Sequence, residues 1–305
     1  MSSETVLRTE SLGKRYGTRW AVQDLNLEVH RGDVFGFLGP NGAGKSTTIR
    51  MILSLITPET GSVEIFGHEL SRHRTAALSK VAGIVEKPDF YLYLSARRNM
   101  QIVGSLTLGR TPAPAKIESC LALVGLTDRA RDLVKTFSHG MKQRLGIAQA
   151  LLCDPELIVL DEPTNGLDPQ GMKEVRELIH HLSTEMGITV LLSSHLLNEV
   201  EQVATRMAII NKGTMVVQGS VDELLRAAVR TTLFSVTPQK KAVRILGELK
   251  GIEQMEVIEG DIRVKVPAKR IPALVSALVD AGCSVHAVTP EHSLERYFLS
   301  VTEQS

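Results

Sequence analysis

The amino-acid sequence predicts an α/β protein: a largely parallel sheet covered by helices, followed by a small α+β domain. Up to about residue 225, short apolar runs alternate with longer helical patterns. From residue 231 the order changes to strand, helix, two strands, helix and strand. A chain of 305 residues is long enough for about two domains. We place them at residues 4–228 and 229–305.

The elements of the first domain follow from its apolar runs and from the residues that end them. Apolar runs bounded by polar residues are typical of strands that a parallel sheet buries on both faces. Pro58 and Gly61 indicate the end of a helix. The predicted strands are residues 18–29, 34–38, 62–66, 81–85, 157–160 and 189–193, and the predicted helices are residues 47–56, 116–124 and 142–152.

The second domain is predicted from the order of its elements. Strands are expected at 232–237 and 284–288, and helices at 240–250 and 270–281. Residues 253–266 turn at Gly260 and Asp261, which indicates a hairpin. The resulting βαββαβ order is that of a ferredoxin-like fold. A last helix is expected at 293–301.

Composition and charge exclude several classes of protein. With 35 Lys+Arg against 34 Asp+Glu, the net charge of +1 argues against broad electrostatic binding of nucleic acid. A chain that is 43% hydrophobic and 23% charged is in the globular range rather than the disordered one. We find neither an apolar run of about 18 residues nor a signal-peptide pattern. The three cysteines lack metal-ligand spacing. We therefore expect a soluble intracellular protein.

A phosphate-binding loop is predicted between the strand at 34–38 and the helix that follows. The motif G-x-x-x-x-G-K-[ST] is formed by Gly39, Pro40, Asn41, Gly42, Ala43, Gly44, Lys45 and Ser46, followed by Thr47. Its glycines let backbone N–H groups surround phosphates, and the helix N-terminus adds a partial positive charge. We expect Lys45 to reach the β- and γ-phosphates and the Ser46 hydroxyl to bind Mg²⁺. The segment predicts a nucleotide site.

Two consecutive carboxylates follow the buried strand at 157–160. Asp161 and Glu162 lie at its carboxyl end, where α/β sheets bind their ligands. Asp161 is expected on the metal side, and Glu162 is expected to polarise the attacking water as a general base. Taken alone, the pair is also consistent with an acidic turn at the end of the strand. The complete phosphate loop in the same chain favours the catalytic interpretation.

Further motifs resemble those of ABC-transporter ATPase subunits over about residues 4–225. The segment Phe137-Ser138-His139-Gly140-Met141 is similar to the signature motif, whose usual form is LSGGQ. His139 replaces the first glycine and Met141 the glutamine. The segment 163–168, ending in Asp168, resembles the D-loop. The other matches are Ser193-Ser194-His195 with the switch-histidine motif, and Tyr16 with the aromatic residue that stacks on adenine.

The resemblance implies a P-loop NTPase domain with a helical signature subdomain, acting as a head-to-tail pair. Each ATP is then held between the phosphate loop of one chain and the signature loop of the other. Ser138 and Gly140 would act on the ATP of the opposite subunit, as would the positive N-terminus of the following helix. His195 would contact the γ-phosphate and hold the water and Glu162 in place. A symmetric dimer would contain two complete sites.

One departure concerns the Q-loop, where the family normally has glutamine after the strand at 81–85. This chain has Glu86. A carboxylate cannot donate the hydrogen bonds of an amide, but it still accepts from Mg²⁺-bound water. We therefore expect Glu86 on the metal side and ATPase activity to be retained. Glu86, its neighbourhood and the tail at 293–299 resemble the ATPases of bacitracin-resistance and lantibiotic-immunity exporters.

These observations predict a motor subunit that hydrolyses ATP to drive export of a drug or antimicrobial peptide through a separate permease. We expect it on the inner face of the cell membrane, touching the membrane only through the permease, as a homodimer or with a paired ATPase. A non-transport ABC ATPase acting on ribosomes or DNA is the alternative. One phosphate loop, no heptad run and a near-zero charge disfavour it. A regulatory role for the C-terminal domain stays open.

Overall fold

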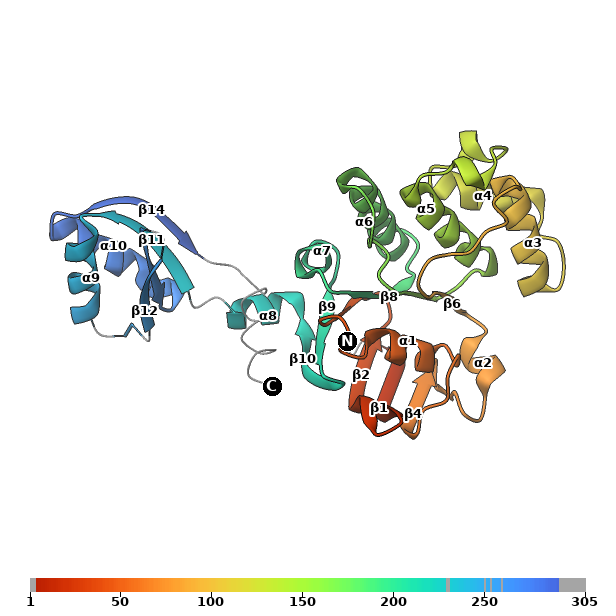
Figure 1. Cartoon of the computed structure of the whole chain (residues 1–305), viewed down its shortest axis with the longest axis horizontal. Helices are drawn as coiled ribbons and strands as arrows, with labels where there is room; N and C mark the ends of the chain where they lie inside the picture. The colour runs from red at the N-terminus through yellow and green to blue at the C-terminus, as the bar shows by residue number, and fades with distance from the viewer. Residues whose placement is uncertain (1–3, 229–230, 250, 253, 259, 291–305) are drawn as a thin grey trace. The chain divides into compact units, whose positions relative to one another are not determined.

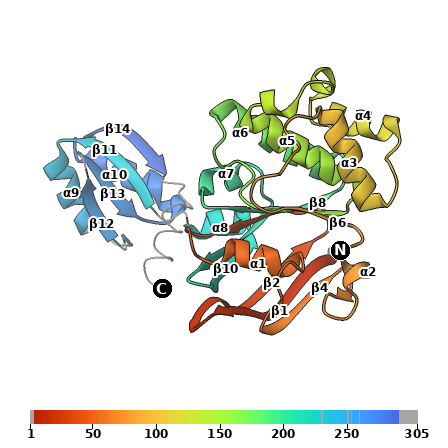
Figure 2. The same cartoon turned by 45° about the vertical axis from the view of Figure 1, so that its right-hand side comes forward.

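A computed structural model describes residues 4–228, 231–249, 251–252, 254–258 and 260–290. The chain divides into two compact units, shown in two views in Figures 1 and 2. The division falls between Val221 and Asp222, at the start of helix α8 (Val221–Ala228). The boundary expected from the sequence lies at the other end of this helix.

The first unit contains the predicted alternation of strands and helices. Each predicted strand is present, with ends within two residues of the expected ones. The strands are β1 (Thr5–Tyr16), β2 (Arg19–His30), β3 (Val34–Leu38), β4 (Thr60–Ile65), β5 (His68–Glu69), β6 (Val81–Ile84), β7 (Leu157–Leu160), β8 (Thr189–Ser194), β9 (Arg206–Asn211) and β10 (Thr214–Ser220). The helices are α1 (Lys45–Ile52), α2 (Arg74–Leu78), α3 (Ala96–Leu108), α4 (Pro114–Leu123), α5 (His139–Ala150), α6 (Pro169–Thr184) and α7 (Leu197–Glu201).

Two sheets enclose the main core of this unit. The larger has the strand order β10-β9-β3-β8-β7-β6, in which only β10 is antiparallel to its neighbour. The smaller, antiparallel sheet has the order β2-β1-β4-β5. Helix α1 lies between them (Figure 2), and its Ile49 and Met51 pack with Phe35 and Phe37 of β3. Burial on both sides explains why β3 and β7 are almost wholly apolar and why β8 contains the apolar run 190–192.

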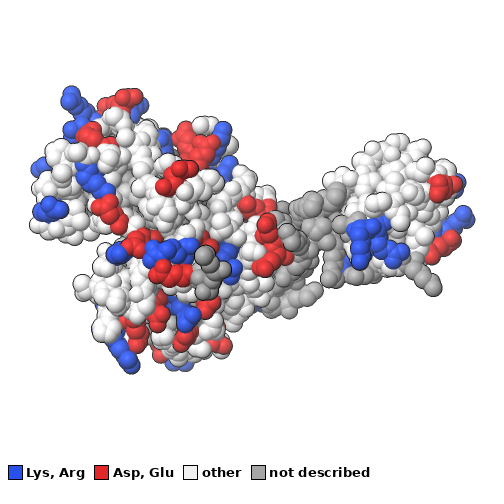
Figure 3. All heavy atoms as spheres, turned by 180° about the vertical axis from the view of Figure 1, so that it is seen from behind, with Lys and Arg blue, Asp and Glu red and all other residues white. Residues whose placement is uncertain are grey.

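The helices α3, α4 and α5 gather on the side of the larger sheet away from the antiparallel one (Figure 1). Helix α5 contacts α3, α4 and α6 and packs against β6. This group is the helical subdomain expected from the resemblance. On the face drawn in Figure 3, positive and negative side chains are interspersed over the first unit.

The second unit is a four-stranded antiparallel sheet with two helices. Its elements are β11 (Thr231–Thr237), α9 (Gln239–Glu248), β12 (Gln254–Ile258), β13 (Asp261–Lys265), α10 (Ile271–Asp280) and β14 (Ser284–Pro290). The strand order is β12-β13-β11-β14. Phe234, Leu246 and Leu278 lie in its core. The βαββαβ order is the predicted one, and the helix expected at 293–301 lies outside the described residues. Among the described residues, no helix has the length and apolar character needed to cross a membrane.

Candidate nucleotide-binding site

The site lies at the carboxyl edge of four neighbouring parallel strands. In the order β3-β8-β7-β6, these strands end at Leu38, Ser194, Leu160 and Ile84. They are followed by the phosphate loop, by His195, by Asp161-Glu162 and by Val85-Glu86. Ligands of α/β sheets bind at this edge. The topology thus brings together motifs that are far apart in the chain.

The phosphate loop needs glycine for both backbone shape and space. Gly42 and Gly44 have φ of 79° and 110°, in the left-handed region that favours glycine. A Cβ on Gly39 would lie 2.5 Å from the carbonyl oxygen of Ile210, and a Cβ on Gly44 would lie 2.5 Å from that of Ala21. Gly44 is the N-cap of α1 and provides no side-chain cap. The first amides of α1 are therefore available to an anion.

Lys45 lies within the loop, and its side chain is only 6% exposed. Its Nζ donates to the carbonyl oxygen of Gly39 at 2.7 Å and lies 3.2 Å from Oε1 of Glu162. The ammonium group thus joins the loop after β3 to the carboxylate after β7. It is held where a phosphate group at the helix N-terminus would meet it.

The residues that follow β7 and β8 form one hydrogen-bonded group. Ser193 Oγ donates to Oδ1 of Asp161 at 2.5 Å and accepts from the backbone N–H of Glu162 at 2.9 Å. Nδ1 of His195 lies 2.6 Å from Oε2 of Glu162. The Glu162 carboxylate therefore contacts Lys45 with one oxygen and His195 with the other. Sequence reasoning used Ser193 only as part of a motif and missed its role as the link.

Glu86 follows β6 at the position that corresponds to Glu162 after β7. Ile84 pairs with Leu160, so both glutamates lie two residues beyond paired positions, and both have positive φ, 63° and 51°. The Glu86 side chain is 67% exposed and forms an ion pair with Arg50 of α1. The sequence did not point to this partner. In this structure the carboxylate expected on the metal side is engaged by an arginine.

The signature segment begins α5 in the helical subdomain. Ser138 is the N-cap, and its Oγ accepts from the backbone N–H of Met141 at 3.2 Å. Gly140 is buried against Gly171 of α6, where an added Cβ would lie 3.5 Å from the Gly171 Cα. Asp168 is the N-cap of α6. The second glycine of the signature motif thus lets α5 and α6 approach each other closely near their N-termini.

The adenine-stacking residue expected from the sequence is exposed at the end of β1. The Tyr16 ring is 52% exposed, and Lys14 Nζ lies 5.9 Å from its centroid. The stacking of this ring on adenine stays a prediction.

The residues present fit a magnesium ion held jointly with a nucleotide. Mg²⁺ is usually bound through one or two carboxylates together with substrate phosphates and waters. Asp161, 3% exposed, and Ser46, in the first turn of α1, offer a carboxylate and a hydroxyl for this purpose. Among the described residues no group of three or more His, Cys, Asp or Glu side chains is placed to hold a metal unaided.

A phosphate loop at a helix N-terminus, with a carboxylate pair and a histidine at adjacent strand ends, defines the site of a P-loop nucleotide hydrolase. Residues 22–165 match the family model described as ABC transporter. The bacitracin transport ATP-binding protein BcrA of Bacillus licheniformis is 43% identical over 299 residues, which cover 97% of each chain. The chain belongs to the ATP-binding subunits of ABC transporters, and it hydrolyses ATP.

Two further similarities cover a smaller share of the chain. The lantibiotic transport ATP-binding protein SrtF of Streptococcus pyogenes is 41% identical over 217 residues, 71% of this chain and 92% of that protein. A solved structure of an ATP-binding subunit of an ABC transporter is 30% identical and covers 73% of this chain and 93% of its own. Its TM-score is 0.63. The match to BcrA, by contrast, spans both units.

Proposed function

We propose that this chain drives the export of a membrane-active antimicrobial, of the bacitracin or lantibiotic class, from the inner face of the cell membrane. The contact of Glu162 with both Lys45 and His195 at the strand edge carries the proposal for the motor. Similarity to BcrA over both units supports the cargo class. The relatives described above are transport ATP-binding proteins, which favours this function over action on ribosomes or DNA.

In hydrolysis, Glu162 takes a proton from the water whose oxygen bonds to the γ-phosphorus. The bond between the γ-phosphorus and the oxygen that bridges to the β-phosphate breaks, and the products are ADP and inorganic phosphate. Lys45 exchanges its bond to the Gly39 carbonyl for phosphate oxygens. His195, at 2.6 Å from Glu162, orients the carboxylate and contacts the γ-phosphate. Ser46 and Asp161 would hold Mg²⁺, which neutralises charge on the β- and γ-phosphates. Ser193 fixes the side chain of Asp161 relative to the backbone of Glu162.

The site is completed by a second ATPase chain, identical or paired. Ser138 is exposed at the N-terminus of α5, and its neutral hydroxyl and the helix amides suit the γ-phosphate bound to the opposite chain. ATP then joins the two chains, and its hydrolysis releases them. The Glu162→Gln variant tests this step: turnover is expected to fall about 10²- to 10⁴-fold, as for loss of a general base, while ATP accumulates in a stable dimer. An undiminished ATPase rate would refute the role of Glu162.

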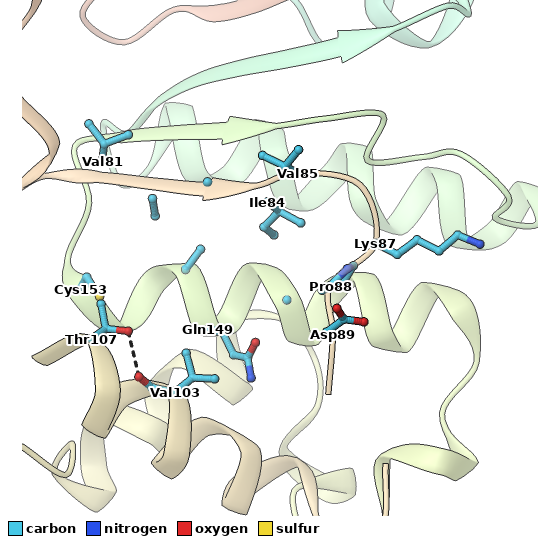
Figure 4. Close-up of a pocket in the computed structure, with 14 residues that line it drawn as sticks. Val81, Ile84, Val85, Lys87, Pro88, Asp89, Val103, Thr107, Gln149 and Cys153 are labelled. Carbon is cyan, nitrogen blue, oxygen red and sulfur yellow. Dashed lines mark hydrogen bonds between the residues drawn. The ribbon is translucent and has the colours of Figure 1, made fainter. Parts of the chain in front are cut away.

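We place the permease on the surface formed by the Q-loop and the helical subdomain. A cavity of about 410 Å³ lies between β6, α3 and α5, and Val81, Ile84, Val103 and Gln149 are among its lining residues (Figure 4). Figure 4 shows Lys87 at the rim of the cavity. An amphipathic helix of the permease suits a cavity whose lining is mixed, with Val81, Ile84 and Val103 beside Gln149 and Lys87.

Exposed aromatic side chains follow directly along the chain. Tyr91, Leu92 and Tyr93 are 58%, 43% and 78% exposed. The backbone here is held, because the N–H of Lys135 donates to the carbonyl oxygen of Leu92 at 2.9 Å and Lys135 Nζ lies 5.3 Å from the Tyr93 ring centroid. Contiguous exposed apolar groups of this kind mark protein-interaction sites.

The transport function is tested by co-expressing the chain with its permease in a cell sensitive to bacitracin and lantibiotics. The wild-type chain is expected to raise the concentration of bacitracin or lantibiotic at which the cells still grow. Glu162→Gln is expected to abolish this gain in resistance. Tyr93→Ala is expected to lower the amount of permease that co-purifies, whereas Leu106→Ala, which removes an exposed side chain from α3, serves as the matched control. Recovery of ribosomes or DNA in place of a permease would refute the proposal.

A further inference from the structure

The ion pair between Arg50 and Glu86 joins the phosphate-loop helix to the Q-loop. Arg50 lies in the last turn of α1, four residues after Ser46, so the two side chains are neighbours on one face of the helix. Packing holds the two elements together at this point: a Cβ on Gly83 of β6 would lie 2.5 Å from Leu53, the C-cap of α1. Arg50 therefore presents a guanidinium one turn beyond the residue expected to bind the metal.

The pair depends on the charge at position 86. A carboxylate forms a charge-assisted hydrogen bond with a guanidinium, about twice as strong as the neutral bond that a glutamine would accept. Glu86 also has a left-handed backbone conformation, with φ of 63°, at the bend that follows β6. This backbone conformation sets the direction in which the side chain leaves the chain. The substitution that distinguishes this Q-loop thus has a specific partner on α1.

Glu86 also connects this pair to the cavity of Figure 4. Its two neighbours in the chain, Val85 and Lys87, both line that cavity, as do Pro88 and Asp89. A movement of Glu86 that reaches its backbone therefore shifts residues that form the cavity wall.

We propose that Arg50 is a positioning residue that holds Glu86 on α1 in the absence of nucleotide and gives it up when ATP binds with its metal. We expect the Glu86 carboxylate to leave Arg50 when it turns to the metal side, because Arg50 and Ser46 lie a full turn apart on α1. The release shifts the segment 85–89 and thereby reports nucleotide binding to the cavity. This inference rests on the proposed function for the metal side of the site and for the permease at the cavity. Because the pair must break, Arg50 lowers the apparent affinity for Mg·ATP.

The test is a double-mutant cycle in the non-hydrolysing Glu162→Gln chain. Binding of Mg·ATP is measured for four chains, with and without Arg50→Met and with and without Glu86→Gln. With Glu86 present, Arg50→Met is expected to tighten binding about two- to fivefold more than it does in the Glu86→Gln background, the range of an exposed ion pair. The matched control is Arg74→Met, because Arg74 binds Ser54 just beyond α1 without touching Glu86. Equal effects of Arg50→Met in both backgrounds would overturn the proposal.

A second measurement uses neither nucleotide nor metal. Hydrogen exchange in residues 85–93 is expected to be faster in Arg50→Met than in the wild type and to be restored in Arg50→Lys, which keeps the charge. Unchanged exchange in Arg50→Met would overturn the proposal even if ATP binding behaved as expected. If the chain failed to bind Mg·ATP, the proposed function would fall, whereas the exchange measurement would still decide whether Arg50 restrains the Q-loop.

Discussion

Ser193 is the residue whose removal tests the site most directly. Its hydroxyl is fully buried, donates to Asp161 and accepts from the backbone N–H of Glu162. Ser193→Ala removes a hydrogen bond to a charged group, which contributes about 1.5–3 kcal/mol, and leaves a buried N–H unpaired. We expect the free energy of unfolding to fall by about 2–3 kcal/mol. A displaced Glu162 carboxylate should lower kcat by about ten- to a hundredfold.

The assay compares Ser193→Ala with Thr189→Val. Thr189 is also fully buried on β8, and its Oγ1 accepts from the backbone N–H of Gly32 at 3.0 Å. Loss of this hydroxyl in Thr189→Val is expected to lower the free energy of unfolding by about 1–2 kcal/mol with little change in kcat. Urea unfolding is followed through Trp20, the single tryptophan, which belongs to β2. If Ser193→Ala kept the wild-type kcat while losing as much stability as Thr189→Val, the positioning role of Ser193 would be refuted.

Two further predictions concern the surface of the first unit and the extent of the motor. Hydrogen bonds from Lys80 and Arg31 lower the pKa of Glu156, so its contribution to stability is present above the pKa of the unfolded chain and is lost as the pH falls through the folded value. Glu156→Gln should therefore be less stable than the wild type at pH 7, and the difference should shrink steadily as the pH falls below about 4.3, the ordinary glutamate pKa, as urea unfolding over this pH range would show; a difference that grew in acid would contradict this. Deleting residues 229–305 should leave the affinity for Mg·ATP within about twofold of that of the full chain, because the strand-edge residues all belong to the first unit. The affinity is measured in a direct binding assay, and a loss of binding would assign the second unit a role in the site.

The parallel sheet was predictable because its strands are buried on both faces. The apolar runs of β3, β7 and β8 carry that signal without help from neighbouring segments. Strand β1 lacks it, because its pairing with β2 shifts register repeatedly and Ser11 has a positive φ of 45°. Regular alternation of buried and exposed residues is lost at such irregularities.

The bounds of helix α6 were not predicted, although its signals are present in the sequence. Asp168 and Pro169 form an N-cap followed by proline at the first helical position, and Val175, Leu178, Ile179 and Leu182 have the spacing of a buried helix face. The D-loop motif ends at Asp168, and the helix begins at the next residue.

For the site, the motifs predicted which residues to examine but not their partners. The contacts of Ser193 with Asp161 and of Arg50 with Glu86 join residues that are 32 and 36 positions apart. They depend on the order and register of strands and on the packing of α1 against β6, which no local pattern contains. Partners of this kind become visible only when the strands have been placed side by side.

The close approach of Gly140 and Gly171 brings two helix N-termini next to each other, and the two differ in what they can still accept. Asp168 already places a carboxylate at the N-terminus of α6, whereas α5 begins at the neutral hydroxyl of Ser138. On the proposed function, a phosphate of the ATP bound to the opposite chain would meet one attractive helix end beside one that its own chain has neutralised. Since this preference arises from the backbone and from Ser138, it survives the departures at His139 and Met141. A degenerate signature motif can thus keep its selectivity for one position of the anion.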